Sequence, residues 1–285
     1  MPETPQPPGT GPSAPREGTV RTRLITAFVL ATILLAVLLW FPPAATVGVL
    51  TLAMLAGAWE WSAFVRPDSL PARSGFVLLI ALLLPLAWRC TATPQHLHLL
   101  LLAATAWWLI ALVWIALAPT RVNAVSAGLA GVLALVPAWT ALMHLRLHAP
   151  EGGVWTVFAL TLVWMADSGA FFAGRRYGRV KLAPRVSPGK TWEGVIGAML
   201  TAAVMGALGA RLFGWGVPAF IVLCLASVAF SIVGDLTESM LKRHVGLKDS
   251  GHLFPGHGGV LDRIDSVTAA APVFLLGLTA GGVMP

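Results

Sequence analysis

Nine apolar stretches follow one another along this chain, and most of them approach the length of about 20 residues that a helix needs to cross a bilayer. Only short polar segments separate them, which leaves little room for a separate soluble domain. The residue types agree, since 57% are hydrophobic and 11% are charged. We therefore predict an all-α fold, a polytopic transmembrane helical protein with about nine spans. The expected spans are residues 24–41, 46–65, 76–88, 97–118, 124–145, 154–173, 194–213, 217–234 and 264–283.

Two of these stretches have features of their own. The first follows Arg21 and Arg23, as in a signal peptide, but its length and the lack of a convincing cleavage site favour an uncleaved span. The third is short and lies between Arg73 and Arg89, so tilting, local thinning of the bilayer and partial re-entry all stay open. Residues 1–20 are rich in Pro, Gly and Ser, which predicts a disordered tail.

The basic residues lie almost entirely on one side of the predicted spans. With the N-terminus in the cytoplasm, only Arg89, Arg146 and Arg211 of the nineteen Lys and Arg residues fall on the opposite side. This asymmetry is the positive-inside pattern, and it predicts a cytoplasmic N-terminus and an outer C-terminus. The net charge of +7 does not indicate nucleic acid as a partner, because the basic residues sit in short loops beside spans. Anionic lipid headgroups and phosphate compounds are better candidates.

A first polar block begins inside the sixth stretch at Asp167. A carboxylate is costly at membrane depth unless it meets a cation or a water-filled cavity, so Asp167 is either functional or paired with an Arg of the following loop. The block ends with Ser187-Pro-Gly-Lys190-Thr191 in front of an expected helix. Hydroxyls, a glycine-opened backbone, a lysine and a helix N-terminus all suit phosphate oxygens. The segment is not a Walker loop, because it lacks the first glycine and a parallel sheet.

A second polar block starts where the eighth stretch ends. Asp235, Glu238, Ser239 and Lys242 recur at positions i, i+3, i+4 and i+7, so they share one helical face. An amphipathic exit helix would show the same stripe, but Asp235 directly continues the apolar run, which favours a buried role. Beyond the Gly-rich turn at 257–259, two aspartates three residues apart open the last span; they could instead only complement the helix dipole. These two are Asp262 and Asp265.

Several carboxylates that converge with Lys, Arg and Ser at one membrane face suggest ligands for Mg²⁺ and a cationic lining for phosphates. Metal-assisted phosphoryl transfer is the chemistry that such a set favours. No Cys and His cluster suggests zinc, and Cys90 and Cys224 are isolated residues that we interpret as packing residues. No Ser, His and Asp arrangement indicates a covalent hydrolase.

The C-terminal block resembles the signature of the phosphatidate cytidylyltransferases, the CDP-diacylglycerol synthases. It reads Ser239-x-x-Lys242-Arg243-x-x-x-x-Lys248-Asp249-x-Gly251-x-x-x-Pro255-x-His257-Gly258-Gly259-x-x-Asp262-Arg263-x-Asp265. The segments at 167–169 and 187–194 are similar to the upstream half of the same family. The resemblance covers roughly residues 164–266, whereas the first five stretches match only in their general hydrophobic character.

The resemblance implies an enzyme of phospholipid biosynthesis that transfers the cytidylyl group of CTP to phosphatidate, giving CDP-diacylglycerol and pyrophosphate. It implies Mg²⁺ as a cofactor, with room for a second cation, and CTP, phosphatidate and the lipid bilayer as partners; a homodimer stays open. The expected location is the inner (plasma) membrane, with the active site facing the cytoplasm. Residues 21–150 are then N-terminal transmembrane helices and residues 151–285 a C-terminal transmembrane catalytic region.

The resemblance also assigns roles to residues. Asp235 and Asp262 are expected to bind the metal ion. The catalytic set comprises Asp235, Asp262, Lys242, Arg243, Lys248, Asp249, Arg263 and Asp265. The substrate-binding set comprises Asp167, Ser187, Lys190, Thr191, Ser239 and His257.

Two other classes of protein fit parts of the pattern. A secondary transporter for a phosphorylated solute would also place charges near broken helices, but both charged blocks lie in the C-terminal half and no inverted repeat is visible. The CDP-alcohol phosphotransferases also use carboxylates and Mg²⁺ at a membrane face, but their D-x-x-D-G-x-x-A-R run is missing here. Glu60 stands alone in the second stretch, where it either closes a polar cavity or pairs with a loop arginine.

Overall fold

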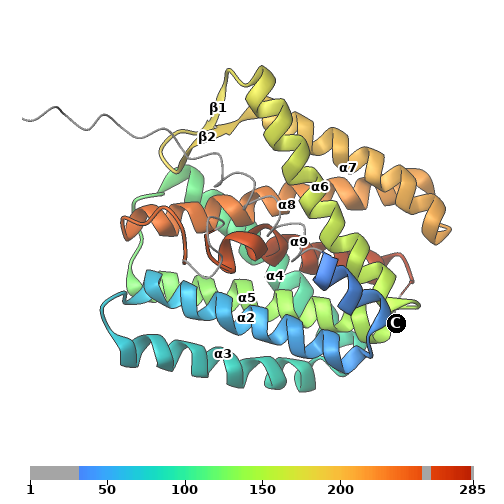
Figure 1. The fold of residues 1–285 in the computed structure, drawn as a ribbon, viewed down its shortest axis with the longest axis horizontal. Coiled ribbons are helices and arrows are strands. Elements are labelled where there is room, and N and C mark those ends of the chain that lie inside the picture. The colour runs from blue at the N-terminus through green and yellow to red at the C-terminus, as the bar shows by residue number, and fades with distance from the viewer. Residues whose placement is uncertain (1–31, 252–257, 284–285) are drawn as a thin grey trace, which may run out of the picture.

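The structure is a computed structural model that describes residues 32–251 and 258–283 (Figure 1). Within that part of the chain, eight helices are long and apolar enough to cross a membrane, which confirms the predicted all-α polytopic fold. Residues 32–40 are also helical, whereas the beginning of the expected first span and the predicted tail lie outside the described residues. The elements are α2 Pro43–Val65, α3 Leu70–Cys90, α4 Pro94–Leu117, α5 Ala124–His148, α6 Gly152–Tyr177, β1 Lys181–Ala183, β2 Ser187–Thr191, α7 Trp192–Phe213, α8 Val217–His244 and α9 Leu261–Ala280.

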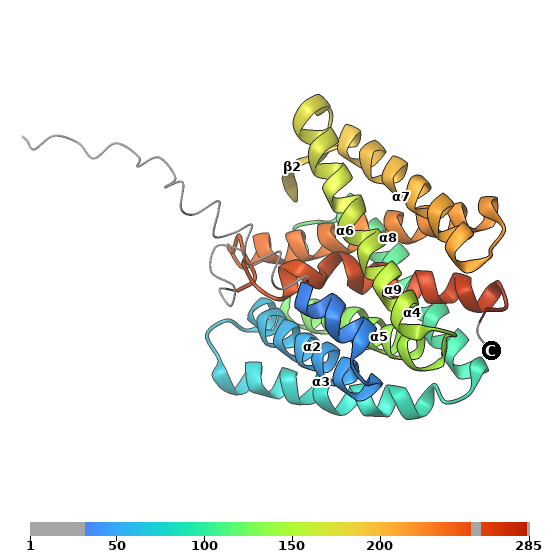
Figure 2. The same cartoon turned by 45° about the vertical axis from the view of Figure 1, so that its right-hand side comes forward.

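The last helix lies at the centre of the bundle. Helix α9 contacts α2, α4, α5, α6 and α8, and Figures 1 and 2 show it enclosed by these helices. Its residues 265–275 are all buried. Small side chains allow this close packing: a Cβ atom at Gly234 of α8 would lie 2.6 Å from the backbone oxygen of Asp265. The helix that carries two of the predicted site residues is therefore fixed on several sides.

Helices α6 and α7 form a pair that leans away from the other helices at one end (Figures 1 and 2). Glycines bring their backbones together, since a Cβ atom at Gly197 of α7 would lie 2.6 Å from the backbone oxygen of Gly169 of α6. At the opposite end the pair is joined by stacked aromatic rings, with the ring centroids of Trp155 and Phe213 3.6 Å apart. Phe220 of α8 and Phe274 of α9 complete this aromatic cluster.

The third span is a full-length helix, so the interpretation as a short or re-entrant segment is wrong. Helix α3 has 21 residues, which at 1.5 Å per residue gives a length of about 30 Å. Arg73 lies within the helix, where its guanidinium donates to the hydroxyl of Ser62 and the backbone oxygen of Trp59 and stands 4.2 Å from the centre of the Trp59 ring. Because a long basic side chain can fold back in this way, it does not shorten the span.

The polar segment between α6 and α7 contains a β-hairpin that the sequence analysis did not predict. Strands β1 and β2 pair antiparallel, with Ala183 opposite Ser187. The backbone of Val180 then accepts from Trp192 and donates to the Glu193 carboxylate, which ties the hairpin to the start of α7. This hairpin lies at the upper left in Figure 1.

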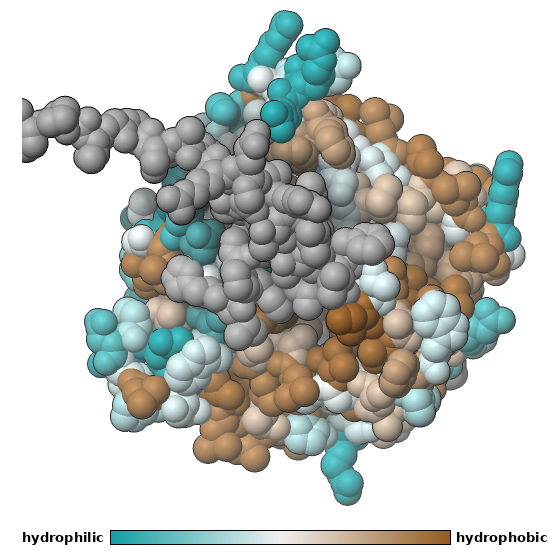
Figure 3. Space-filling view, in the orientation of Figure 1, coloured by the Kyte–Doolittle hydropathy of each residue, from teal (hydrophilic) through white to brown (hydrophobic). Residues whose placement is uncertain are grey.

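The outer surface of the bundle is apolar. Hydrophobic residues dominate the right and lower parts of the view in Figure 3, whereas hydrophilic residues gather near the hairpin and along the left edge. One outward stripe follows α7, where every fourth residue is exposed and apolar; these are Ile196, Leu200, Val204, Leu208 and Leu212. Such a surface suits lipid chains.

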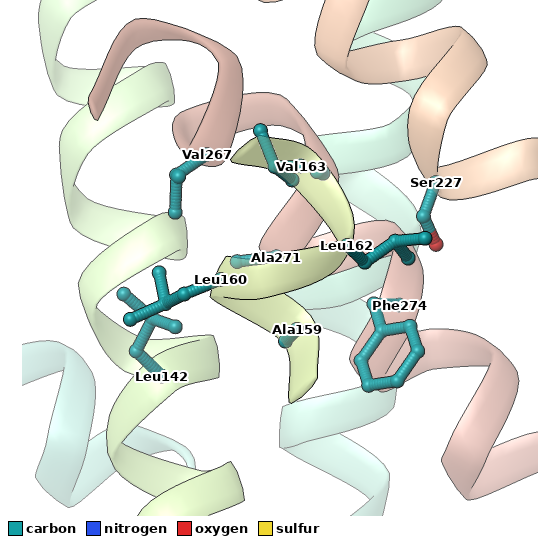
Figure 4. A pocket seen from close by; sticks show the side chains of 10 residues that line it. Leu142, Ala159, Leu160, Leu162, Val163, Ser227, Val267, Ala271 and Phe274 are labelled. Carbon is teal, nitrogen blue, oxygen red and sulfur yellow. The ribbon is translucent and has the colours of Figure 1, made fainter. Parts of the chain in front are cut away.

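A small cavity lies in the core between α5, α6, α8 and α9 (Figure 4). Its volume is about 10 Å³, and its walls are apolar apart from Ser227, whose hydroxyl donates to the backbone of Leu223. A space of this size is about one water molecule across, so it is a packing gap rather than a substrate site.

Candidate active site

The two polar blocks meet in one cavity at the end of the bundle where α6 and α8 end and α7 and α9 begin. The cavity has a volume of about 470 Å³, which is in the range of small-molecule sites. Its charged lining residues come from four different elements, and apolar side chains line the rest, among them Phe171, Val195 and Ile232. The charged residues are Asp167, Arg175, Lys190, Asp235, Asp262 and Asp265.

An ion pair joins the hairpin to α8. The ammonium of Lys190 lies 2.5 Å from a carboxylate oxygen of Asp235, and each side chain is a little over one quarter exposed. On the same helix, the hydroxyl of Ser239 donates to the other oxygen of Asp235 at 3.3 Å. Asp235 and Ser239 thus share a face, as their spacing predicted. The pair brings the phosphate-like segment of the first block against the carboxylates of the second.

A second charge network connects α8 with α9. Lys242 Nζ lies 2.7 Å from Asp262 Oδ1 and 3.0 Å from Glu238 Oε2. The backbone amides of Ser250 and Gly259 also donate to Asp262, at 3.1 and 2.7 Å. Because three groups orient it, the Asp262 carboxylate has little freedom to turn.

Steric constraints explain why the turn before α9 contains glycine. Gly258 has a φ of +76°, a conformation that side chains disfavour. In addition, a Cβ atom there would lie 2.5 Å from Asp262 Oδ2. The turn therefore needs glycine to close around this carboxylate.

Two further carboxylates lie deeper. Asp265 is buried, and its Oδ1 accepts from the backbone amide of Ser266 at 2.6 Å. Glu238 is 1% exposed, and within the described part of the chain its Oε1 has no hydrogen-bond partner. Acidic groups therefore outnumber basic ones around the cavity, which favours the binding of cations.

The predicted site residues fall into two groups. Asp167, Lys190, Thr191, Asp235, Asp262 and Asp265 line the cavity. Lys242 and Ser239 support this lining through hydrogen bonds to Asp262 and Asp235. The others lie outside the lining formed by the described residues, with Ser187 in β2 and the rest exposed: Arg243, Lys248, Asp249 and Arg263. His257 lies outside the described residues.

Thr191 also has a structural part. Its hydroxyl accepts from the backbone amide of Gly194 at 3.2 Å, which caps the N-terminus of α7. A Cβ atom at Gly174 would lie 3.1 Å from the same hydroxyl. The threonine thus fixes the start of α7 and its distance from α6.

Several lining residues are missing from the sets that the resemblance implied. Arg175, Ser231 and Ser266 line the cavity, and Glu238 binds Lys242 behind it. A signal existed for Glu238, which belongs to the i, i+3, i+4 stripe, and for Ser266, which follows Asp265. Arg175 and Ser231 gave no signal of their own, because one is an ordinary loop-side arginine and the other a small residue in an apolar run.

The donor chemistry of the cavity fits a magnesium ion, although the described residues do not form a cage for one. Carboxylate oxygens are the ligands that Mg²⁺ prefers, and the ion usually takes one or two of them together with substrate phosphates. Within residues 32–251 and 258–283, no three His, Cys, Asp or Glu side chains stand close enough together to bind an ion. Asp235 and Asp262 each bind a lysine instead.

Fold and cavity together define a polytopic membrane protein with a charged, partly apolar pocket at one end of its helices, suited to phosphate compounds and to lipid. Its similarity to known proteins identifies the family. Residues 21–280 match the profile of the Cytidylyltransferase family. The chain belongs to this family, as the resemblance predicted.

The chain is also similar to individual members. It is 40% identical to the phosphatidate cytidylyltransferase of Haemophilus influenzae, over 90% of this chain and 97% of the relative. The identity is again 40% with the phosphatidate cytidylyltransferase of Pseudomonas aeruginosa, over 92% of this chain and 98% of the relative. The enzyme of the same name from Brucella suis is 53% identical over a shorter part, 39% of this chain.

Proposed function

We propose that this protein is an enzyme that transfers the cytidylyl group of CTP to phosphatidate, with CDP-diacylglycerol and pyrophosphate as products. The observation that carries the proposal is the cavity in which Lys190, Arg175 and four aspartates meet beside apolar side chains. The names of the full-length relatives support the same reaction. A triphosphate and a lipid phosphate both need cationic partners, and the lipid also needs apolar contact.

In the reaction, an oxygen of the phosphatidate phosphate forms a bond to the α-phosphorus of CTP. The bond from that phosphorus to the oxygen bridging the α- and β-phosphates breaks, and its electron pair leaves with pyrophosphate. The attacking phosphate is already ionised, so positioning and charge neutralisation matter more than a protein nucleophile. Lys190 and Arg175 line the cavity and would bind phosphate oxygens, and Lys242 orients Asp262.

A magnesium ion bound by Asp235 and Asp262 would supply charge stabilisation for the triphosphate. Asp235 and Asp262 now bind lysines, and in holding the ion they would give up these contacts. Lys190 and Lys242 would then be free to bind phosphates. Asp167 and Asp265 line the same cavity and are the next candidates, including for a second cation.

We further propose that the protein lies in the inner membrane, with the cavity at the cytoplasmic side. The distribution of basic residues supports this orientation, since most lie at the end of the helices where the cavity opens. CTP would then enter from the cytoplasm and phosphatidate from the surrounding bilayer.

The direct test uses the purified protein in detergent with CTP, phosphatidate and Mg²⁺. We expect CDP-diacylglycerol and pyrophosphate in equal amounts, no pyrophosphate when phosphatidate is omitted, and no product when EDTA is added. Pyrophosphate release without lipid, or movement of a phosphorylated solute into sealed vesicles without any pyrophosphate release, would contradict the proposed reaction.

A further inference from the structure

Glu60 of α2 lies far from the cavity residues in sequence but is buried next to them in space. It is 6% exposed, and it accepts three hydrogen bonds. Its Oε2 accepts from the hydroxyl of Ser250 at 3.0 Å and from the backbone amide of Leu261 at 2.7 Å. Its Oε1 accepts from the amide of Val260 at 3.0 Å. One side chain therefore binds both ends of the segment from Ser250 to Leu261.

The Glu60 carboxylate accepts hydrogen bonds from the backbone amides at the start of α9. The first backbone amides of a helix have no partner within the helix, and no side chain of the N-cap residue Val260 accepts from them. Glu60, which belongs to α2, accepts hydrogen bonds from these amides instead. Its negative charge lies where the dipole of α9 favours one. The start of α9 is thus fixed to α2.

The glycines of the signature run fit around the same carboxylate. Ideal Cβ atoms at Gly251 and Gly259 would both collide with the carboxylate oxygens of Glu60. These two glycines therefore allow the backbone to approach Glu60 closely. In the same way, a Cβ atom at Gly258 would collide with the carboxylate of Asp262. The three glycines thus lie against two carboxylates, Glu60 and Asp262, of which Asp262 lines the cavity.

Ser250 connects the two carboxylates. Its hydroxyl donates to Glu60, while its backbone amide donates to Asp262. Gly259, whose amide donates to Asp262, directly precedes the two residues whose amides donate to Glu60. A movement of Ser250 or Gly259 relative to Glu60 would therefore move the donors that orient Asp262.

We propose that Glu60 is a positioning residue for the cytidylyl transfer: by fixing both ends of the Ser250–Leu261 segment, it sets the place and orientation of the Asp262 carboxylate. The proposal rests on the proposed function, since it assigns Asp262 a part in that reaction. Glu60 itself does not line the cavity and is a support for the site rather than a group that touches substrate.

The test compares Glu60→Gln with Ser62→Ala. Ser62 lies on the same helix, is 1% exposed and binds Arg73 and the backbone of Trp59, so its loss perturbs α2 without breaking a contact to the segment. Glutamine keeps the shape of Glu60 but turns one acceptor into a donor that faces amide hydrogens. We expect Glu60→Gln to lower kcat by about 10- to 100-fold and to raise the Mg²⁺ concentration for half-maximal turnover, as loss of a supporting contact typically does.

A second readout does not depend on activity. Hydrogen exchange, measured in detergent without Mg²⁺ or substrate, reports on the backbone amides of Val260 and Leu261. We expect exchange there to be faster by about tenfold in Glu60→Gln, because a charge-assisted hydrogen bond is lost, and unchanged in Ser62→Ala. Glu60→Gln with wild-type exchange at these amides would overturn the proposal, and so would a lowered melting temperature accompanied by unchanged kcat and Mg²⁺ dependence.

Ser250→Ala provides a variant that removes a single hydroxyl and should fold if Glu60→Gln does not. We expect the same changes, smaller in size, and little further loss when it is combined with Glu60→Gln, since both act through one contact. Fully additive effects would argue against a shared unit. The wild-type protein separates the two proposals: if it forms no CDP-diacylglycerol, the proposed function fails, while the exchange measurement still tests whether Glu60 fixes the segment.

Discussion

The two aspartates proposed as metal ligands differ in their surroundings. Asp235 has one lysine partner and one hydroxyl donor. Asp262 has a lysine and two backbone amides, and it belongs to the turn that begins α9. Loss of charge at the two positions should therefore affect catalysis alike and stability differently.

For Asp235→Asn we expect turnover to fall at least about 100-fold, because a neutral amide is a poor ligand for Mg²⁺ and leaves triphosphate charge uncompensated. The melting temperature should change little, since the ion pair with Lys190 is partly exposed and such pairs contribute about 0 to 1 kcal/mol. Turnover against Mg²⁺ concentration, beside a thermal unfolding curve, measures both. Near-normal turnover of Asp235→Asn at the Mg²⁺ concentration that suffices for the wild type would show that other carboxylates bind the metal ion.

For Asp262→Asn we expect a similar loss of turnover together with a clearly lower melting temperature. The amide nitrogen of asparagine must face one of the donors that now bind the carboxylate, which leaves a donor unsatisfied. The same two measurements apply. If only stability fell, Asp262 would be a helix-capping residue and not part of the reaction.

Lys242 matters for stability through the buried Glu238. We expect Lys242→Met to destabilise the protein by about 3 to 5 kcal/mol, because it leaves Glu238, which is 1% exposed, as an uncompensated buried charge. The double variant with Glu238→Gln should recover much of this loss. Thermal unfolding in detergent measures the series, with Lys248→Met as the control, since Lys248 is exposed. Equal melting temperatures for Lys242→Met and the control would show that Glu238 is not charged in the folded protein.

At the scale of elements, the α6 and α7 pair determines one wall of the cavity. Asp167 lies on α6, and Lys190 lies in the hairpin that joins the two helices. The glycine contact between Gly169 and Gly197 sets their distance. A change at that contact should therefore affect stability and catalysis together.

We expect Gly197→Leu to cost about 1 to 3 kcal/mol or more, since a side chain must force the two backbones apart. Turnover per folded molecule should also fall as the cavity wall moves. Gly48→Ala is the control, because nothing lies within 4 Å of its Cβ position in α2; it should stabilise slightly, by about 0.5 to 1 kcal/mol. Thermal unfolding and the product assay check both. Wild-type stability for Gly197→Leu would mean that the pair does not depend on close packing.

The elements also show what sequence patterns could and could not predict. Long apolar runs predicted the spans, because a bilayer dictates length and composition locally. The spacing of Asp235, Ser239 and Lys242 predicted a shared face for the same reason, since helical periodicity is local. The pair between Lys190 and Asp235 depends on segments far apart in the chain, and the charge pattern predicted only that both blocks lie on one side. The length of α3 was underestimated because Arg73 was counted as a boundary, whereas its side chain folds back onto α2.

At the scale of the whole molecule, the orientation in the membrane is open to direct measurement. In a protein whose two native cysteines are replaced, we expect a cysteine at Lys248→Cys to react with a membrane-impermeant reagent only after the cells are opened. A cysteine at Arg211→Cys, at the other end of the bundle, should react in intact cells. Both positions are exposed, so burial does not account for a difference. The reverse pattern would place the cavity on the outer side and contradict the proposed orientation.

The bond between Glu60 and the start of α9 also has a consequence in time. A chain is synthesised from its N-terminus, so α2 enters the membrane long before its partners Ser250, Val260 and Leu261 exist. Until then the Glu60 carboxylate lacks these hydrogen-bond donors, in a membrane environment where an uncompensated charge is costly. Helix α2 therefore completes its packing only after α9 has been inserted. A chain that ends before α9 would retain Glu60 as a carboxylate without its hydrogen-bond donors.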